Sequence, residues 1–357
     1  MAALRETAKN LLLLAASLAF TFALLELAFS AYYGPAEFAS TPFGVYLHKP
    51  GTTYHFSGLT ESGEFNTTLK TNSLGFFDGE WATEKSPNSV RFLFLGDSFV
   101  EAKQVPQDLS FSALSEALLS ESLDGPAKAE VLNFGASAVG TFEEELIYKN
   151  LGTRFKHDYV VLFFFPNDLE NNYTATVVRK EGLYSLARGI VNNSRFLGTM
   201  LRLLPGAPAV AGADLFTGWR RVYAPVIGNE MEHGWGVAFE KILAIKREAE
   251  GNGSVFVLSY VPAPFEIEGQ YPHEFSREDL EKASFEKPFL KLKEFAEANN
   301  VLFLDARTEF VSLVESRSPE SFYFPGDGHF NEEGHELYAQ VLSRKLAGLV
   351  EGLQKEE

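Results

Sequence analysis

The hydrophobic positions of this chain fall into short, wholly apolar runs that alternate with longer amphipathic stretches. Val90 to Leu95 is the first such run, and it stops at Gly96-Asp97-Ser98. Tyr159 to Phe165 has no polar alternation, so both faces of this strand should be covered. The apolar runs predict strands at residues 90–95, 129–134, 159–165, 254–260 and 301–304.

The amphipathic stretches between these runs predict helices. Asp108 or Ser110 can cap the first helix, and Pro288 should interrupt or restart a later one. The predicted helices cover residues 108–123, 142–155, 234–249, 278–299 and 332–353. Strands that alternate with helices predict an α/β fold with a central parallel sheet of about five strands and right-handed crossovers.

The N-terminus has a different pattern, because Leu11 to Tyr33 is apolar apart from Glu26. A run of about 20 apolar residues is long enough to cross a bilayer as a helix. Arg5 and Lys9 precede this run, so the positive-inside rule predicts residues 1–10 in the cytoplasm and the rest of the chain on the extracytoplasmic side. The alternatives are a signal peptide that is cleaved after the run, and a buried core helix.

Composition narrows the class of protein. The chain has 357 residues, enough for one large α/β domain, and its net charge of −17 disfavours a nucleic-acid partner. The absence of cysteine excludes disulfides and thiolate metal sites.

The expected organisation after the transmembrane helix at 11–33 is an approach segment at 34–89 and a domain at 90–357. An insertion at about 171–230 is expected to act as a lid over the sheet edge.

Polar residues follow three of the predicted strands and precede the last predicted helix. Ser98 ends the first strand, a Gly- and Ser-rich turn around Ala138 follows the second, and Asn167 follows the third. Asp327 and His329 precede the last helix. The carboxyl ends of parallel strands lie at one edge of a sheet, so these groups should converge. A nucleophile, a base, an orienting acid and oxyanion donors together are the set that acyl transfer needs.

Other chemistries find little support. No pair of histidines has metal-ligand spacing, so neither a metal nor another cofactor is predicted. His335 lies inside the start of the last helix and is predicted to be structural. A nucleotide-binding flavodoxin-like domain is disfavoured because no Gly-rich phosphate loop follows the first strand.

These motifs resemble those of the SGNH hydrolases, the GDSL-like lipase/esterase superfamily, and more closely the branch with an N-terminal membrane anchor. The resemblance covers about residues 71–168 and 324–338 well, including Thr71-Asn-Ser-Leu-Gly-Phe-Phe-Asp78. It implies a flavodoxin-like three-layer α/β/α sandwich. Gly96-Asp97-Ser98 corresponds to the nucleophile block, Pro166-Asn167-Asp168 to the Gly-x-Asn-Asp block, and Asp327-Gly328-His329 to the Asp–His block.

Three positions depart from the common family pattern. Ala138 stands where the family usually has a glycine, and alanine fits without strain only at a negative φ. Phe165 replaces the leading glycine of the third block and is expected to alter the pocket wall. The Asp327–His329 spacing is one residue shorter than usual, as in some branches of the family.

The resemblance implies a serine esterase that needs no cofactor. Ser98 would be the nucleophile, His329 the base and Asp327 the orienting acid. The backbone N–H groups of Ser98 and Ala138 and the amide of Asn167 would form the oxyanion hole. By analogy with the anchored branch, the expected substrate is an acylated, often acetylated, cell-surface carbohydrate. Two alternatives stay open: an O-acyltransferase with an acyl-transfer partner in the membrane, and a catalytically silent binding or assembly module.

Overall fold

The computed structural model describes residues 2–33, 37–58, 63–123, 128–177, 194, 196–197, 200, 218–267, 277–317 and 322–355. Contacts divide the chain into two compact units: Met1–Ser40 with Glu181–Ala211, and Thr41–Lys180 with Gly212–Glu357. Most of the predicted insertion at 171–230 lies outside the described residues. The lid therefore stays a prediction.

The first unit contains the N-terminal helix α1 (Ala2–Tyr33) and the short strand β1 (Phe38–Ser40). Within α1, Arg5–Ala31 is long and apolar enough to cross a membrane, with a mean hydropathy of 2.2. Glu26 is the acidic residue of the apolar run Leu11–Tyr33, and it has protein partners. Its Oε2 accepts hydrogen bonds from the Ser194 hydroxyl at 2.6 Å and from the Phe196 N–H at 3.2 Å.

The second unit is built on a parallel five-stranded sheet, which confirms the predicted fold class. The strand order is β6-β5-β7-β8-β9, so the first strand of the sheet lies between the second and the third. This is the flavodoxin-like order, and its topological switch point lies between β5 and β7. Every predicted strand is present: β5 (Ser89–Gly96), β6 (Lys128–Gly135), β7 (Tyr159–Phe164), β8 (Val255–Tyr260) and β9 (Leu302–Leu304).

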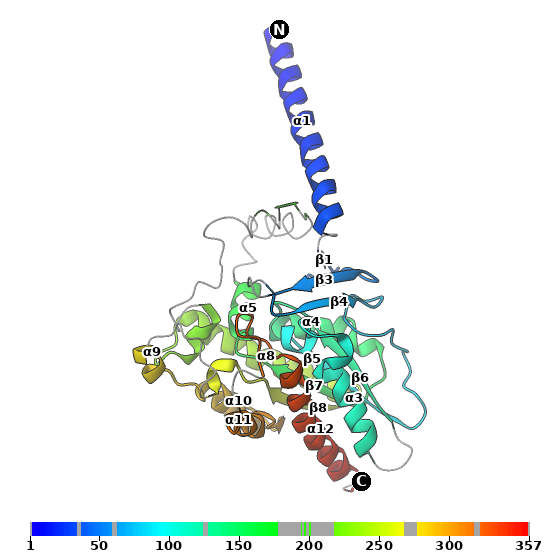
Figure 1. Ribbon diagram of the computed structural model, residues 1–357, viewed down its shortest axis with the longest axis vertical. Coiled ribbons are helices and arrows are strands. Elements are labelled where there is room, and N and C mark those ends of the chain that lie inside the picture. Colours follow the sequence, from blue (N-terminus) through cyan, green and yellow to red (C-terminus); the bar gives the residue numbers. More distant parts are fainter. Residues whose placement is uncertain are drawn as a thin grey trace. The chain divides into compact units, whose positions relative to one another are not determined.

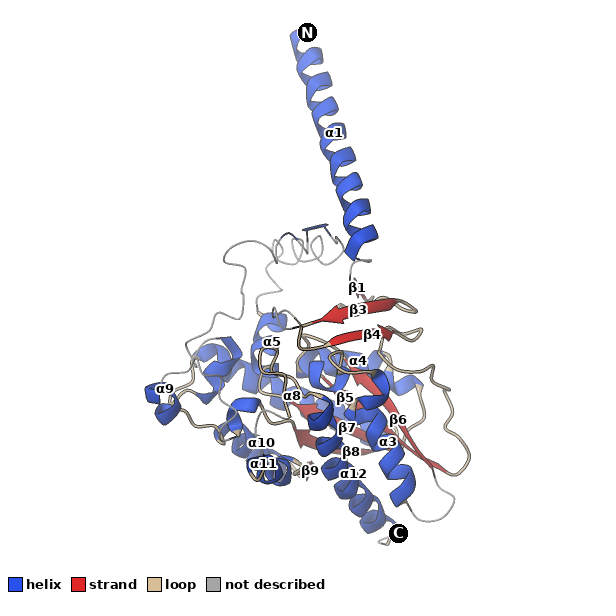
Figure 2. Cartoon of the chain, in the orientation of Figure 1, coloured by secondary structure: helices blue, strands red, loops and turns tan. Residues whose placement is uncertain are grey.

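Helices cover both faces of this sheet (Figures 1 and 2). The first crossover, through α3 (Phe111–Ser122), runs from β5 outward to β6, whereas the next, through α4 (Thr141–Asn150), runs back past β5 to β7. Right-handed crossovers in opposite directions place these two helices on opposite faces. The C-terminal helix α12 (Glu332–Gln354) packs against α3, and α8 (Asn229–Gly251) packs against α4.

Several helices differ from the expected ones. Residues 278–299 form two helices, α9 (Arg277–Lys282) and α10 (Lys287–Ala298), because Pro288 lacks an N–H and fits only in a first turn. The expected helix at 142–155 ends at Asn150. Within the described ranges, α5 (Asp168–Thr176), α11 (Arg307–Glu315) and the one-turn helix α2 (Ser98–Glu101) were not predicted. The remaining short turns of helix are η1 (Gln107–Leu109), η2 (Gly152–Arg154), η4 (Gly218–Tyr223) and η5 (Pro264–Glu266).

Residues 41–80 pack onto the α/β domain as part of the same unit. They contain β2 (Tyr46–His48) and an antiparallel pair, β3 (Thr53–Ser57) with β4 (Asn66–Lys70). Asn72 organises the following turn, because its Oδ1 accepts the Leu74 and Phe76 N–H groups at 3.0 and 3.1 Å. Asp78 then accepts the Asn133 N–H at 3.0 Å, which ties this segment to β6.

Candidate active site

Ser98, His329 and Asp327 are joined by hydrogen bonds, although Ser98 and His329 are 231 positions apart in the sequence. The Ser98 Oγ lies 2.8 Å from His329 Nε2, and His329 Nδ1 lies 2.6 Å from Asp327 Oδ1. Ser98 is 7% exposed. The side chains of Asp327 and His329 are each 22% exposed, so a ligand can reach the imidazole.

The protonation pattern of this chain of groups follows from the Asp327 carboxyl. Burial would raise the pKa of Asp327, but the hydrogen bond and charge of His329, with Lys103 and Gln104, lower it below its ordinary value. Gln104 contributes a hydrogen bond from its Nε2 to Asp327 Oδ1 at 3.0 Å. An ionised carboxylate only accepts hydrogen bonds, so the proton of neutral His329 is on Nδ1. Nε2 is then free to accept the proton of Ser98.

The local sequence explains why Ser98 lies at this place. Strand β5 ends at Gly96, and an additional one-turn helix, α2 (Ser98–Glu101), begins at Ser98 itself, ahead of the predicted helix α3. Asp97 caps this turn by accepting the Phe99 N–H at 2.9 Å. The Asp97 carboxyl is 1% exposed, and burial raises its pKa despite the Phe99 N–H and the nearby His329.

Asn167 follows β7 and so lies on the other side of the switch point from Ser98. Its side chain lies beside the Asp97 carboxyl and opposes the rise of that carboxyl's pKa. The Asn167 Oδ1 is buried and has no hydrogen-bond partner among the described residues. An amide carries two N–H donors, so even with one N–H of Asn167 directed at Asp97 a second N–H is available.

Ala138 lies in the turn between β6 and α4, and it is exposed. Its φ is +57°, in the left-handed region, so the unstrained negative φ that alanine prefers is not adopted. A left-handed conformation costs alanine roughly 1–2 kcal/mol, and it persists only where neighbours fix the backbone. On the far side of the turn, the Asn171 side chain donates to the Val139 carbonyl at 2.7 Å.

Phe165 is 3% exposed. Its ring turns inward and packs on Phe99, with the ring centroids 4.4 Å apart, so the expected change of the pocket wall stays a prediction. Phe99 in turn packs against the His329 imidazole at 4.7 Å. The two phenylalanines therefore support the ring of His329 from inside the domain.

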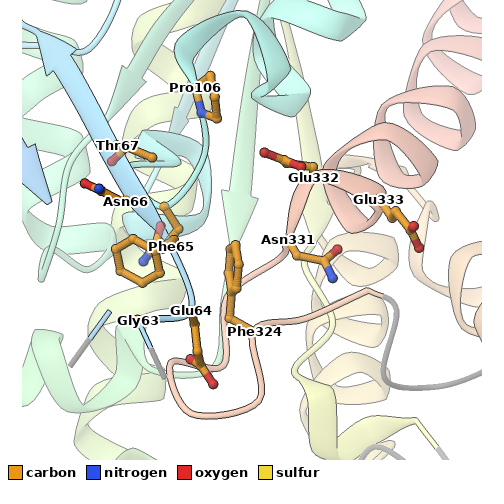
Figure 3. A pocket seen from close by; sticks show the side chains of 11 residues that line it. Gly63, Glu64, Phe65, Asn66, Thr67, Pro106, Phe324, Asn331, Glu332 and Glu333 are labelled. Carbon is orange, nitrogen blue, oxygen red and sulfur yellow. The ribbon is translucent and has the colours of Figure 1, made fainter. Parts of the chain in front are cut away.

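A pocket of about 470 Å³ lies beside the Asp327 end of this site (Figure 3). Gln104, which holds Asp327, lines it, and so do two aromatic rings, Phe65 and Phe324, whose centroids are 5.4 Å apart. The rest of the lining is mostly polar and acidic: Gly63, Glu64, Asn66, Thr67, Pro106, Asn331, Glu332 and Glu333. The Gln104 side chain is 2% exposed, and its Oε1 has no hydrogen-bond partner among the described residues.

Sequence reasoning missed residues that support the site. Gln104 carries no motif, and only the fold brings it to Asp327. Glu101 gave a weak signal, because it is an acidic residue in the otherwise apolar turn after Ser98.

His335 is buried, accepts the Phe111 N–H at 3.1 Å through Nδ1, and has a pKa lowered by burial to about 3. Within the described ranges, no group of three or more His, Asp or Glu side chains could hold a metal ion.

The fold and these contacts define a parallel α/β domain with a Ser–His–Asp constellation at its switch point. No family model matches the sequence, and no curated protein matches it. Among solved structures, the chain is similar to Axe2, an acetylxylan esterase from Geobacillus stearothermophilus, with 16% identity, a TM-score of 0.41, and 72% of this chain and 93% of that chain covered.

Two further solved structures are similar over the same share of this chain, 72%. A lipase/acylhydrolase from Enterococcus faecalis has 15% identity and a TM-score of 0.40, with 96% of that chain covered. LAE5, an alpha/beta hydrolase enzyme from the metagenome of Lake Arreo, Spain, has 15% identity and a TM-score of 0.43, with 95% of that chain covered. At such low identities and TM-scores, the chemistry of this chain has to rest on its own residues.

Proposed function

We propose that this protein is a serine esterase of the SGNH type. The observation that carries the proposal is the unbroken series of short contacts from Ser98 Oγ through the His329 imidazole to Asp327, at 2.8 and 2.6 Å. Serine is a weak nucleophile at its ordinary pKa and needs an adjacent base to become reactive. A base at hydrogen-bond distance that is itself oriented by a carboxylate supports nucleophilic catalysis rather than a purely structural role.

The reaction follows from the protonation states. Ser98 Oγ attacks the ester carbonyl while His329 Nε2 takes its proton, and Asp327 stabilises the imidazolium that forms. The imidazolium then gives the proton to the leaving alcohol, and an acyl-Ser98 remains. Water, deprotonated by the same nitrogen, hydrolyses the acyl enzyme and restores Ser98.

The developing oxyanion needs donors on the side of the carbonyl away from His329. Three donors are assigned here: the N–H groups of Ser98 and Ala138 and the second N–H of Asn167. The exposure of Ala138 and the unused donor of Asn167 support these assignments. Each such donor is worth roughly 10²–10³ in kcat.

For the substrate, we assign an ester of a neutral carbohydrate, in the first place an O-acetyl ester. The pocket beside Asp327 supports this assignment, since its carboxylates and amides accept hydrogen bonds from hydroxyl groups and its two rings offer apolar faces. Glu64, Glu332 and Glu333 would repel an anionic chain. A neutral acetylated oligosaccharide should therefore be preferred over an acetylated uronic-acid oligosaccharide of equal length.

The location assigned to the reaction is the extracytoplasmic face of a membrane, with α1 retained as a single-pass anchor. The apolar span of α1 and the basic residues Arg5 and Lys9 ahead of it support this topology. Protease added to intact cells or spheroplasts should digest the domain after residue 41 and leave a membrane-bound N-terminal fragment. Protection of the whole chain would contradict this orientation.

The test of the proposed function uses the full-length chain in detergent, with p-nitrophenyl acetate and a fluorophosphonate probe. Ser98→Ala and His329→Ala should each lower kcat by on the order of 10⁴–10⁶, because members of such a set act as a unit. The probe should label wild type and not Ser98→Ala. Ser254→Ala is the matched control, a buried serine at the amino end of β8 whose hydroxyl donates to the His157 carbonyl at 2.8 Å.

Turnover that survives in both variants would disprove the assignment. Absence of both turnover and labelling in wild type would favour the silent binding module. Addition of a deacetylated oligosaccharide separates hydrolysis from transfer, because a transferase would move the acetyl group to the sugar instead of releasing acetate.

A further inference from the structure

Glu101 is a buried carboxylate three residues after Ser98, and the reaction above does not use it. It is the last residue of α2 and is 3% exposed. Both of its oxygens have hydrogen-bond donors. Oε1 lies 2.8 Å from His48 Nε2 and accepts the Ser137 N–H at 3.0 Å, and Oε2 accepts the Ser137 hydroxyl.

Glu101 is held in the ionised state. Burial would raise its pKa, but the charge and hydrogen bond of His48, with Lys103 and Ser137, lower the pKa to about 2. An ionised carboxylate has no proton to donate, so the hydrogen between His48 and Glu101 belongs to His48 Nε2. The contact is therefore a charge-assisted bond, which is stronger than a bond between neutral groups.

His48 comes from the segment that precedes the α/β domain. It ends β2, is 3% exposed, and packs among the rings of Phe77, Tyr54 and Phe56 at centroid distances of 4.6, 5.1 and 6.1 Å. These rings fix the direction of the imidazole. Residues 41–80 thereby deliver one oriented donor to the first turn after Ser98.

Ser137, the other partner of Glu101, directly precedes Ala138. The strained φ of +57° at Ala138 has to be imposed by its neighbours, and Glu101 holds both the backbone N–H and the hydroxyl of the residue before it. The turn also approaches α2 closely at Gly135, where a Cβ would lie 2.1 Å from the Glu101 backbone nitrogen. The Glu101 side chain and the close backbone contact both fix this turn against the helix that carries Ser98.

We infer that Glu101 and His48 are positioning residues for the oxyanion hole. They hold Ser137 so that the N–H of Ala138 keeps its direction relative to Ser98, and neither touches the substrate. This inference rests on the proposed function, in which Ala138 supplies an oxyanion donor. It also makes residues 41–80 a structural part of the active site instead of a spacer between membrane and domain.

The main test is the double variant His48→Phe with Glu101→Leu in the full-length chain. Replacing both members of a buried pair by apolar residues of similar volume is often neutral for the fold, whereas removal of one member leaves a buried group without its partner. With p-nitrophenyl acetate, kcat should fall roughly 10–100-fold with KM unchanged, because a misdirected oxyanion donor weakens binding of the transition state only.

Two milder variants make the readout specific. Ser137→Ala removes only the hydroxyl bond and should lower kcat by less than the double variant, about tenfold. Glu101→Gln keeps an oxygen for His48 and the Ser137 N–H and can donate to the Ser137 hydroxyl, so it should retain most of the activity. Ser254→Ala, at the opposite edge of the sheet, should leave kcat unchanged.

The outcomes separate this inference from the proposed function. If wild type turns over ester and Ser98→Ala does not, an unchanged kcat in the double variant overturns the positioning role alone. If wild type and Ser98→Ala are equally inactive, the proposed function fails. A crystal structure of the double variant then still tests the positioning role of Glu101 and His48. An unmoved turn at residues 136–140 with φ near +57° at Ala138 would overturn that role.

Discussion

Two buried glutamates lie on either side of the turn that carries Ala138, and they are in opposite electrostatic situations. Glu101, before the turn, has three hydrogen-bond donors and a pKa of about 2. Glu144, on α4 after the turn, is fully buried, and neither of its carboxyl oxygens has a hydrogen-bond partner among the described residues. Burial and the nearby Asp97 and Glu143 raise the pKa of Glu144 well above its ordinary value.

Burial alone therefore does not decide the charge of a carboxyl. Donors keep Glu101 ionised, whereas no donor from the described part of the chain reaches the side-chain oxygens of Glu144 or its neighbour Asp168, and burial raises the pKa of both.

The largest effect should come from exchanging each glutamate for leucine. Glu101→Leu leaves His48 and Ser137 without their acceptor and should lower the free energy of unfolding by about 3–5 kcal/mol. Glu144→Leu removes a group with no partner and should be neutral or stabilising at pH 7. Urea unfolding followed by circular dichroism measures both. Equal destabilisation by the two variants would show that Glu144 has a partner in the folded protein.

The next effect concerns Asn167, whose side chain is a donor beside the buried Asp97 carboxyl and opposes the rise of its pKa. Asn167→Ala removes this donor and one oxyanion donor, so kcat for p-nitrophenyl acetate should fall roughly 10²–10³-fold. The loss should be smaller than that of Ser98→Ala. Asn167→Asp is a useful second variant, because it keeps the size of the side chain but adds a carboxyl beside Asp97. A loss of less than threefold in Asn167→Ala would remove Asn167 from the oxyanion hole.

The two glutamates should also respond to pH with opposite signs. The pKa of Glu101 is lowered to about 2, so its contribution to stability is present above about pH 4.5 and is lost as the pH falls toward 2. The pKa of Glu144 is raised, so its contribution is present below about pH 4.5 and is lost as the pH rises through the raised pKa.

The pH effect is measured as the unfolding free energy of wild type and Glu144→Gln between pH 4 and pH 8. The variant should gain on wild type as the pH rises, by up to about 1.4 kcal/mol per pH unit for one proton. Asp97, Glu143 and Asp168 face Glu144 and share the titration. His335, whose pKa is about 3, loses its contribution as the pH falls from 6.5 toward 3 in both proteins and cancels. Parallel curves would contradict a raised pKa at Glu144.

The smallest effect should be found at Ala138 itself. Ala138→Gly relieves the left-handed strain but makes the unfolded chain more flexible, so a net stabilisation of about 1 kcal/mol or less is expected. The activity should change little while Glu101 still holds Ser137. A rise of a few degrees in Tm on thermal unfolding would agree with this. A destabilised variant would mean that the alanine methyl group packs favourably.

The sequence predicted the positions of the strands better than it predicted the helical segments that connect them. Wholly apolar runs such as Tyr159–Phe164 need cover on both faces, which makes a buried parallel strand the simplest solution. Helices α5 and α11 escaped prediction because their apolar stripes are short, and α5 begins in a polar Asn-Asp turn. The one-turn helix at Ser98 was missed because four residues show no periodicity.

The sequence alone determined which chemical groups stand at the carboxyl ends of the strands. Ser98, Ala138 and Asn167 each follow a strand, and in a parallel sheet the ends of these strands lie at one edge. The contact of Asp327 with His329 joins residues two positions apart, although this spacing is shorter than the usual family pattern. Only the tertiary structure decided that Gln104 holds Asp327, that His48 reaches Glu101 from 53 residues away, and that φ at Ala138 is positive. The sequence does not predict these three features because they do not depend on spacing along the chain. Burial and donor geometry set the charge and direction of each side chain instead.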